Sequence, residues 1–119
     1  MSRPLVLFAC LAFAVALPLA APNYYVNIGT LVLFAAFLGQ SCVNCHRVRG
    51  TPAQGGYAPD LTHLMSRKTL ASGMVENTPE NLRLWVSDPQ QIKPGCLMPA
   101  FGLSDRDRDD IVRYLLTLR

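Results

Sequence analysis

The chain has 119 residues, half of them hydrophobic, and a formal net charge of +3 at neutral pH. This length allows one domain at most, and so small a charge, with no basic stripe, excludes a nucleic-acid-binding protein. No Asp, Glu, Lys or Arg occurs between Arg3 and Arg47. We therefore predict an apolar leading segment and then a soluble domain small enough to need a cofactor or metal to complete its core.

Residues 1–23 combine one positive charge, a long apolar run and the small residues of PLAAP. This pattern is typical of a secretory signal peptide, cleaved near Ala20 or Ala21. Residues 4–22 are also 19 uncharged residues in a row, close to the roughly 20 that span a bilayer, so an uncleaved membrane anchor is the alternative. Both interpretations place the following domain outside the cytoplasm, and we expect membrane association through this N-terminal segment where it is retained.

Residues 24–41 form a second apolar stretch, which contains VNIGTLVLFAAFLG and leads into the first helix of the domain. It lacks the polar face of a helix on a globular surface. Residues 42–119 hold every charged side chain except Arg3 and form the predicted domain proper. Because no alternating strand pattern occurs, we predict an all-α fold class.

Capping residues and proline positions place the first helices of this domain. Residues 50–59 are rich in Gly and Pro and predict a loop. Asp60 can cap a short helix through LTHLMSR, and residues 69–72 predict one further helical turn. Thr78, followed by a proline in the first helical position, predicts a helix that ends before Pro89.

The remaining residues predict one loop and one helix. Residues 88–103 contain three prolines and two glycines, which favours an irregular loop. Ser104, with an acidic residue three positions on, is a capping pair that starts the last helix. Its apolar stripe is Ile111, Leu115 and Leu118.

Residues 42–46 read CVNCH, and Cys-x-x-Cys-His is the attachment signature of a c-type haem. Cys42 and Cys45 are three positions apart, so both thiols lie on one side of a helical turn and can reach two vinyl groups of a porphyrin. His46 lies four positions after Cys42, on the same side, and points at the iron. The sequence thus predicts one haem c, covalently attached through Cys42 and Cys45.

A six-coordinate haem iron needs a second axial ligand, and we predict Met98. It lies in KPGCLMP, where flanking prolines make a stiff loop that can keep a weak thioether ligand in place. Met65 has helical spacing from Leu61 and is interpreted as a core residue. The predicted metal ligands are therefore His46 and Met98, a pair that raises the reduction potential.

Two other kinds of site remain open. Cys42, Cys45, His46 and Cys96 could form a structural zinc-binding module, although adjacent Cys45 and His46 are poor simultaneous tetrahedral ligands. Cys42 and Cys45 could also be the redox pair of a thiol–disulfide oxidoreductase, but the βαβ context is missing. No catalytic constellation of an enzyme is recognisable, so we expect an electron carrier without a small-molecule substrate.

Four sequence blocks carry a family resemblance: FLGQSCVNCHRVRGTPA, APDLTHLMSRKTLASG, NTPENLRLWVSDPQQIKPG with the following LMPAF, and IVRYLLTL. Through them, residues 37–119 resemble a class I c-type cytochrome, and more narrowly the C-terminal cytochrome c domain of subunit II of bacterial haem–copper cytochrome c oxidases. The resemblance implies a small cytochrome c fold, with three to five helices around one covalently bound haem. It also implies one-electron transfer to redox protein partners, a terminal oxidase or other cytochromes, on the periplasmic side of the bacterial inner membrane.

The resemblance implies roles for further residues. The carbonyl of Pro59 would accept the Nδ1 hydrogen of His46, Trp85 would pack on the haem edge with its N–H facing a propionate, and Arg67 would neutralise a propionate. Phe37 and Tyr114 would meet where the first and last helices cross.

Three departures from the family pattern stand out. The first helix begins with apolar residues where the family has charged ones and a Gly. Cys96, two residues before Met98, could be a small buried hydrophobe, an interchain disulfide partner or a rival iron ligand. The paired cysteines of the dinuclear copper site found in the full subunit are absent from this sequence, so we expect a cytochrome unit that stands alone or is a fragment.

Overall fold

The computed structural model describes residues 22–119 and, before them, Pro4, Cys10 and Ala12. The predicted signal peptide or membrane anchor at residues 1–23 therefore lies almost wholly outside the described residues. None of the described helices is both long and apolar enough to cross a membrane.

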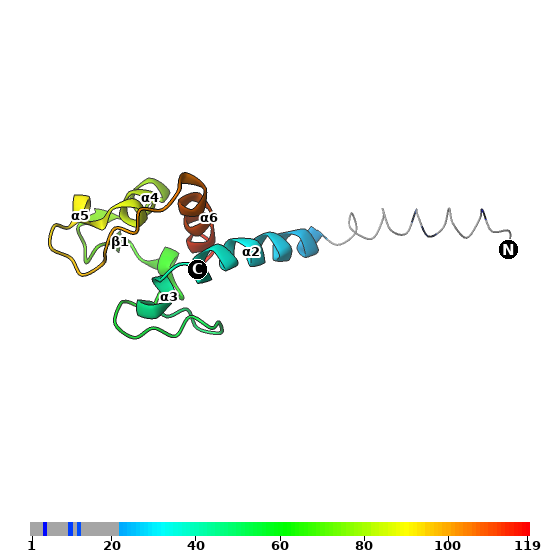
Figure 1. The fold of residues 1–119 in the computed structure, drawn as a ribbon, viewed down its shortest axis with the longest axis horizontal. Coiled ribbons are helices and arrows are strands. Elements are labelled where there is room, and N and C mark those ends of the chain that lie inside the picture. The colour runs from blue at the N-terminus through cyan, green and yellow to red at the C-terminus, as the bar shows by residue number, and fades with distance from the viewer. Residues whose placement is uncertain (1–3, 5–9, 11, 13–21) are drawn as a thin grey trace. The chain divides into compact units, whose positions relative to one another are not determined.

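The described chain is mostly helical, as predicted, with one short antiparallel hairpin (Figure 1). Its elements are α2 (Pro22–Leu38), α3 (Cys42–Cys45), the 3₁₀ helix η1 (Leu64–Ser66), β1 (Thr69–Leu70), β2 (Val75–Glu76), α4 (Pro79–Ser87), α5 (Pro89–Ile92) and α6 (Asp105–Leu115). The hairpin pairs Leu70 with Val75.

The hairpin shows that the predicted helical turn at residues 69–72 is wrong. Ala71 and Ser72 have φ angles of 53° and 61°, and Gly73 has a φ of 91°. Three successive residues with positive φ cannot belong to a right-handed helix, and they reverse the chain direction between β1 and β2. The all-α prediction therefore needs this one addition.

Two other predicted elements differ in detail. Residues 88–103 are not all loop, because Pro89–Ile92 form the single turn α5, capped by Asp88 Oδ1, which accepts from Gln90 N at 3.0 Å. Asp60 caps no regular α-helix. Its carboxylate accepts from Thr62 N at 2.8 Å in a local turn, and only residues 64–66 continue as a 3₁₀ helix.

The caps predicted for the two longer helices of the domain are confirmed. Thr78 Oγ1 accepts from Asn81 N at 3.2 Å at the start of α4. Ser104 Oγ accepts from Asp107 N at 3.1 Å and donates to the Asp107 carboxylate at 2.7 Å, so the α6 cap is reciprocal. Such caps contribute about 0.5–2 kcal/mol each to stability.

The chain divides into two compact units, Met1–Val32 and Leu33–Arg119, so the second unit begins part-way along α2. Neither this division nor the helix bounds test the domain boundaries predicted at residues 23 and 41, which stay predictions. In α2, Leu31 and Val32 are exposed apolar side chains.

The core of the Leu33–Arg119 unit joins its first and last helices. The ring centroid of Tyr114 in α6 lies 5.1 Å from that of Phe34 and 5.3 Å from that of Phe37. Helix α4 packs against α6, and an ion pair of Arg83 with Asp109 links the two helices. The buried core residues are Phe37, Val48, Ala53, Leu61, Leu64, Leu70, Leu82, Val86, Ile111, Val112, Tyr114 and Leu115.

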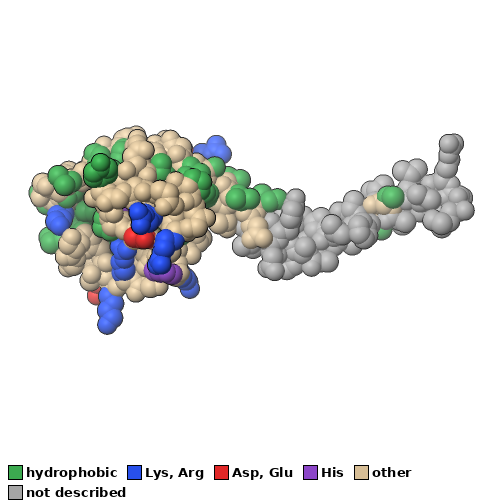
Figure 2. All heavy atoms as spheres, turned by 90° about the horizontal axis from the view of Figure 1, so that it is seen from below, with side chains coloured by type: hydrophobic (Ala, Val, Ile, Leu, Met, Phe, Trp, Pro, Cys, Tyr) green, Lys and Arg blue, Asp and Glu red, His purple; other side chains and the backbone are tan. Residues whose placement is uncertain are grey.

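Charged side chains lie on the outside of this unit. Figure 2 shows a face on which Lys and Arg side chains gather around a histidine and an acidic side chain. Arg49 Nε and Asp60 Oδ2 form an ion pair 3.8 Å apart, and both side chains are exposed. Exposed pairs of this kind contribute only about 0.2–1 kcal/mol, so the apolar core dominates the stability of the unit.

Candidate functional site

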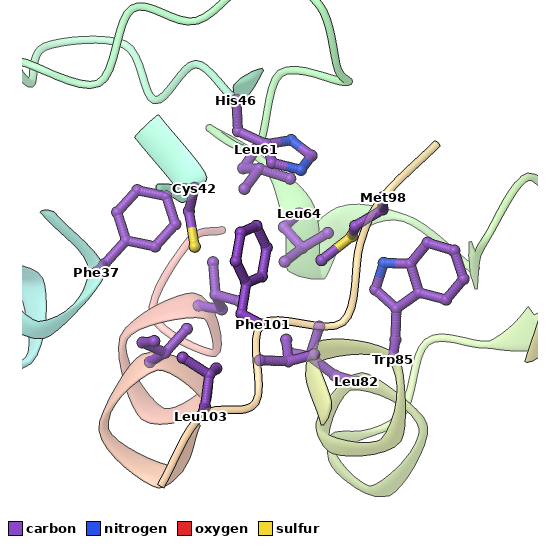
Figure 3. A pocket seen from close by; sticks show the side chains of 13 residues that line it. Phe37, Cys42, His46, Leu61, Leu64, Leu82, Trp85, Met98, Phe101 and Leu103 are labelled. Atoms are coloured by element: carbon purple, nitrogen blue, oxygen red, sulfur yellow. The ribbon is translucent and has the colours of Figure 1, made fainter. Parts of the chain in front are cut away.

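An apolar hollow in the Leu33–Arg119 unit brings several predicted site residues together. It is partly open, and its empty space, open solvent included, is about 500 Å³. Figure 3 shows His46 and Met98 reaching this space from different segments, with Trp85 beside Met98. The lining residues are Phe37, Cys42, His46, Leu61, Leu64, Leu82, Trp85, Val86, Met98, Phe101, Leu103, Ile111 and Leu115.

The CVNCH segment forms one helical turn, α3, and His46 N donates to Cys42 O at 2.9 Å directly after it. Cys42 is half-buried and lines the hollow, whereas Cys45 is exposed and is not among the lining residues. Both thiols are free. Burial raises the pKa of the Cys42 thiol above its ordinary value of 9.0, so this thiol is uncharged in its apolar surroundings at neutral pH.

Backbone hydrogen bonds attach the loop of residues 50–59 to this turn. Gly55 N donates to His46 O at 3.2 Å, and Ala58 N donates to Cys45 O at 3.0 Å. A Cβ placed on Gly55 would come within 2.7 Å of both the backbone nitrogen and the carbonyl oxygen of Cys45. Only glycine allows so close an approach.

The imidazole of His46 is oriented by its backbone partner. Its Nδ1 lies 2.8 Å from the carbonyl oxygen of Pro59. Because a carbonyl can only accept, Nδ1 must carry the hydrogen, and the Nε2 lone pair is left free. Carbonyl partners of this kind fix the orientation and tautomer of metal-binding histidines.

Met98 lies in the segment between α5 and α6 and is half-buried. Of the described methionines, Met98 alone lines the hollow. Met65 packs against the core instead, and Met74 is 57% exposed. The structure thus places one thioether in the same apolar space as one imidazole.

Two predicted site residues lie elsewhere in the described structure. The guanidinium of Arg67 donates to the carbonyl oxygen of Asp60 and does not line the hollow. Cys96 is half-buried, and its thiol lies within reach of the Gln90 amide.

Hydrogen bonds from the Thr62 hydroxyl and backbone hold the pKa of the Asp60 carboxyl below its usual range.

The zinc alternative finds no support in this geometry. Within residues 22–119 and the three described positions before them, no group of three or more His, Cys, Asp or Glu side chains is placed to hold a metal ion.

Sequence reasoning did not assign several residues of the hollow. Phe101 lies near its centre in Figure 3, and its only signal is an aromatic residue three positions after Met98. Leu82 of α4 and Leu103 before α6 also contribute. Their apolar character is visible in the sequence, but their convergence on one space is a property of the fold.

A comparison with protein families matches the cytochrome c model over residues 34–119. This chain belongs to the cytochrome c family. The match covers the Phe37–Tyr114 contact, α3 and the Met98 segment. The cytochrome is accordingly a haem-binding electron-transfer domain, which works with redox protein partners.

Curated relatives support the narrower resemblance. The cytochrome is 39% identical over 84 residues to cytochrome c oxidase subunit 2 of Alkalihalophilus pseudofirmus, 70% of this chain and 24% of the relative. It is 36% identical over 89 residues to cytochrome c oxidase subunit 2 of Bacillus sp. strain PS3, 71% of this chain and 25% of the relative. The same subunit of Bacillus subtilis is 30% identical over 87 residues, 70% of this chain and 24% of that protein. The chain thus spans about a quarter of the length of these relatives.

The residues present fit a haem. The hollow is lined by apolar side chains, apart from the imidazole, indole, thiol and thioether groups of His46, Trp85, Cys42 and Met98. Imidazole and thioether are axial ligands of cytochromes c, and apolar surroundings tune the reduction potential. No ion pair or buried charge would have to be removed to admit a flat apolar cofactor, because the described structure has no buried charged residue.

Proposed function

We propose that this cytochrome carries one electron at a time on a single haem c that is attached through Cys42 and Cys45 and ligated by His46 and Met98. The hydrogen bond of 2.8 Å between His46 Nδ1 and Pro59 O carries the proposal. It leaves Nε2 as the free nitrogen of an imidazole that lines the same hollow as the Met98 thioether.

When bound, a haem supplies an iron centre that accepts and donates one electron. The protein contributes the rest. Cys42 and Cys45 offer two thiols from one helical turn, and the apolar side chains that line the hollow would shield much of the cofactor from water. Exclusion of water from the site lowers the local dielectric constant, which is one of the means by which a protein tunes a reduction potential.

Two further residues are part of this proposal. Trp85 lines the hollow beside Met98 (Figure 3), which supports packing of its ring against the cofactor. Arg67 donates to Asp60 O in the described structure. Its implied role beside a propionate would therefore require its guanidinium to exchange or share that partner.

We further propose a terminal oxidase as electron acceptor and the periplasmic side of the bacterial inner membrane as location. The relatives named cytochrome c oxidase subunit 2 support the acceptor. The absence of charge between Arg3 and Arg47 supports export, by a cleaved signal peptide or a retained anchor at residues 1–23. Protease treatment of spheroplasts would test the location: a protected, cytoplasmic chain would contradict it.

Production in a host with periplasmic haem-attachment machinery tests the cofactor. After denaturation in alkaline pyridine, we expect the spectrum of a haem with both vinyl groups saturated, with one haem per chain. Single Cys42→Ser and Cys45→Ser variants should each leave at most one thioether bond and shift this spectrum. A colourless wild-type protein, or haem that organic solvent extracts fully, would refute covalent attachment.

Met98→Ala tests the second axial ligand, and Met74→Ala is its matched control because Met74 is 57% exposed. We expect Met98→Ala to lose the ferric absorption band of thioether ligation and to lower the reduction potential, since Met/His ligation raises it. Met74→Ala should leave both unchanged. An unaltered spectrum and potential in Met98→Ala would exclude this ligand.

A further inference from the structure

We infer that Gln90 is a positioning residue, which holds the segment of residues 95–98 so that the Met98 side chain stays in the hollow. This inference rests on the proposed role of Met98 as an axial ligand. It also gives a function to the single-turn helix α5, which contains neither the haem-attachment motif nor a proposed axial ligand.

The Gln90 amide binds this segment at several points. Its Oε1 accepts from Gly95 N at 2.9 Å. Its Nε2 donates to Cys96 O at 3.0 Å and to Met98 O at 3.2 Å, and the Cys96 sulfur lies 3.2 Å from the same nitrogen. The orientation of the amide is determined by these partners, because a flipped amide would oppose two carbonyl oxygens with its own oxygen.

The segment has few other polar attachments. Cys96 N donates to Lys93 O at 3.2 Å, but in the described structure no backbone–backbone hydrogen bond involves residues 97–103. Among the described residues, the Met98 carbonyl accepts, besides Gln90, only from the weakly donating Cys96 thiol, at 3.5 Å. Leu97 is fully exposed, so apolar packing at that residue does not hold the segment either.

The position of Gln90 is itself fixed by contacts of helix α5. Its backbone nitrogen donates to Asp88 Oδ1 at 3.0 Å, and the preceding Pro89 is among the most deeply buried side chains of the domain. Helix α5 packs against α4. The hydrogen bonds of the Gln90 amide therefore fix the Met98 backbone relative to α4 and α5.

This arrangement has a consequence for ligand binding. A thioether is a weak ligand that holds only if little conformational freedom is lost when it binds, and a pre-ordered segment keeps that loss small. Without the Gln90 amide, the segment samples more conformations, and the fraction of protein with Met98 in place falls. A competing ligand then binds more tightly in proportion to the open fraction.

Imidazole binding to the ferric holoprotein measures this fraction, because imidazole competes with Met98 for one position. Gln90→Glu is isosteric and can still accept from Gly95 N, but it turns an oxygen toward two carbonyls. Gln90→Leu removes all the contacts. We expect both variants to bind imidazole at least tenfold more tightly than the wild type does, in proportion to the larger open fraction.

Gln91→Leu is the matched control. Gln91 lies on the same turn and is exposed. In the part of the chain that the structure describes, its Nε2 hydrogen-bonds only to the Asp88 carboxylate, at 3.2 Å. We expect its imidazole affinity to lie within twofold of that of the wild type. A general destabilisation of α5 would move this control together with the Gln90 variants, which would contradict a specific role for the Gln90 amide.

The outcomes separate this inference from the function on which it rests. If Met98→Ala loses thioether ligation but both Gln90 variants bind imidazole as the wild type does, the positioning role is refuted and the ligand assignment stands. If Met98→Ala leaves the spectrum unchanged, the ligand assignment is refuted and the positioning role falls with it. Should Gln90→Leu not fold, Gln90→Glu alone decides, because it preserves size and one of the hydrogen bonds.

Discussion

Replacing Gly55 with alanine should destabilise the cytochrome although the substitution adds a single methyl group. The new Cβ would lie within 2.7 Å of the Cys45 backbone nitrogen and carbonyl oxygen, inside the distance that real Cβ atoms adopt. Neither partner is a flexible side chain that can move aside. The loop and the CVNCH turn would have to separate, and the hydrogen bond from Gly55 N to His46 O, 3.2 Å long, would be strained or lost.

The expected cost follows from these two effects. Overpacking by one methyl group costs about 1–3 kcal/mol, and a lost backbone hydrogen bond costs about 0.5–1.5 kcal/mol. We therefore expect Gly55→Ala to lower the free energy of unfolding by roughly 2–4 kcal/mol. Gly56 provides the matched control, because a Cβ there meets nothing within 4 Å and its φ is not positive. Gly56→Ala should be neutral or stabilising by about 0.4–1 kcal/mol, through the unfolded state.

Urea unfolding of the holoprotein, followed by far-UV circular dichroism, measures both variants under the same conditions. The slope of the transition should be unchanged, so that a shift of its midpoint reports stability. If Gly55→Ala unfolds at the same urea concentration as Gly56→Ala, the loop does not pack against the CVNCH turn as closely as described, and the reasoning is wrong.

Two further predictions concern the contact between the first and last helices. Phe37→Ala removes a side chain that is only 1% exposed, and we expect it to cost about 3–5 kcal/mol in urea unfolding; a cost below 1 kcal/mol would contradict its place in the core. Burial raises the pKa of the Tyr114 phenol above its ordinary value of 10.0, so the stability it contributes is present below pH 10 and is lost as the pH rises through the folded-state pKa. Tyr114→Phe should therefore lose less stability than the wild type between pH 9 and 11, as measured by thermal unfolding, and identical pH profiles would exclude this effect.

Much of the fold was predictable from local chemistry. Thr78 and Ser104 were predicted as caps, and both accept the expected backbone hydrogen bonds, because capping depends on residues within one turn of each other. Spacing likewise predicted that residues 42–45 form one helical turn. The meeting of Phe37 with Tyr114 came from the family resemblance, and their rings lie 5.3 Å apart.

The failures have two physical causes: some residues carry no local signal, and at others two local signals conflict. Ala71 and Ser72 adopt positive φ, a conformation that composition does not announce, so the hairpin was missed. The Asp88 cap of α5 resembles the Thr78 cap, but the prolines that follow it predicted a loop. Two adjacent glycines gave no indication that Gly55, and not Gly56, faces the backbone of Cys45.

The candidate site divides in the same way. The haem-attachment motif and Met98 were recognisable because their residue types are chemically distinctive. The hydrogen bonds of Gln90 to residues 95–98 were not, because a glutamine on a short helix is common and its partners are defined only by the folded chain.

The tilted ring contacts of Phe34 and Phe37 with Tyr114 have a consequence for the maturation of the protein. The partners of this contact lie near opposite ends of the domain's sequence, so the aromatic cluster cannot assemble until nearly the whole domain is available to fold. The CVNCH segment lies between them in sequence, and we expect it to be accessible until that cluster forms. We therefore expect the C-terminal helix to complete the core late. The Cys42 and Cys45 thiols can then be modified before the surrounding core has formed.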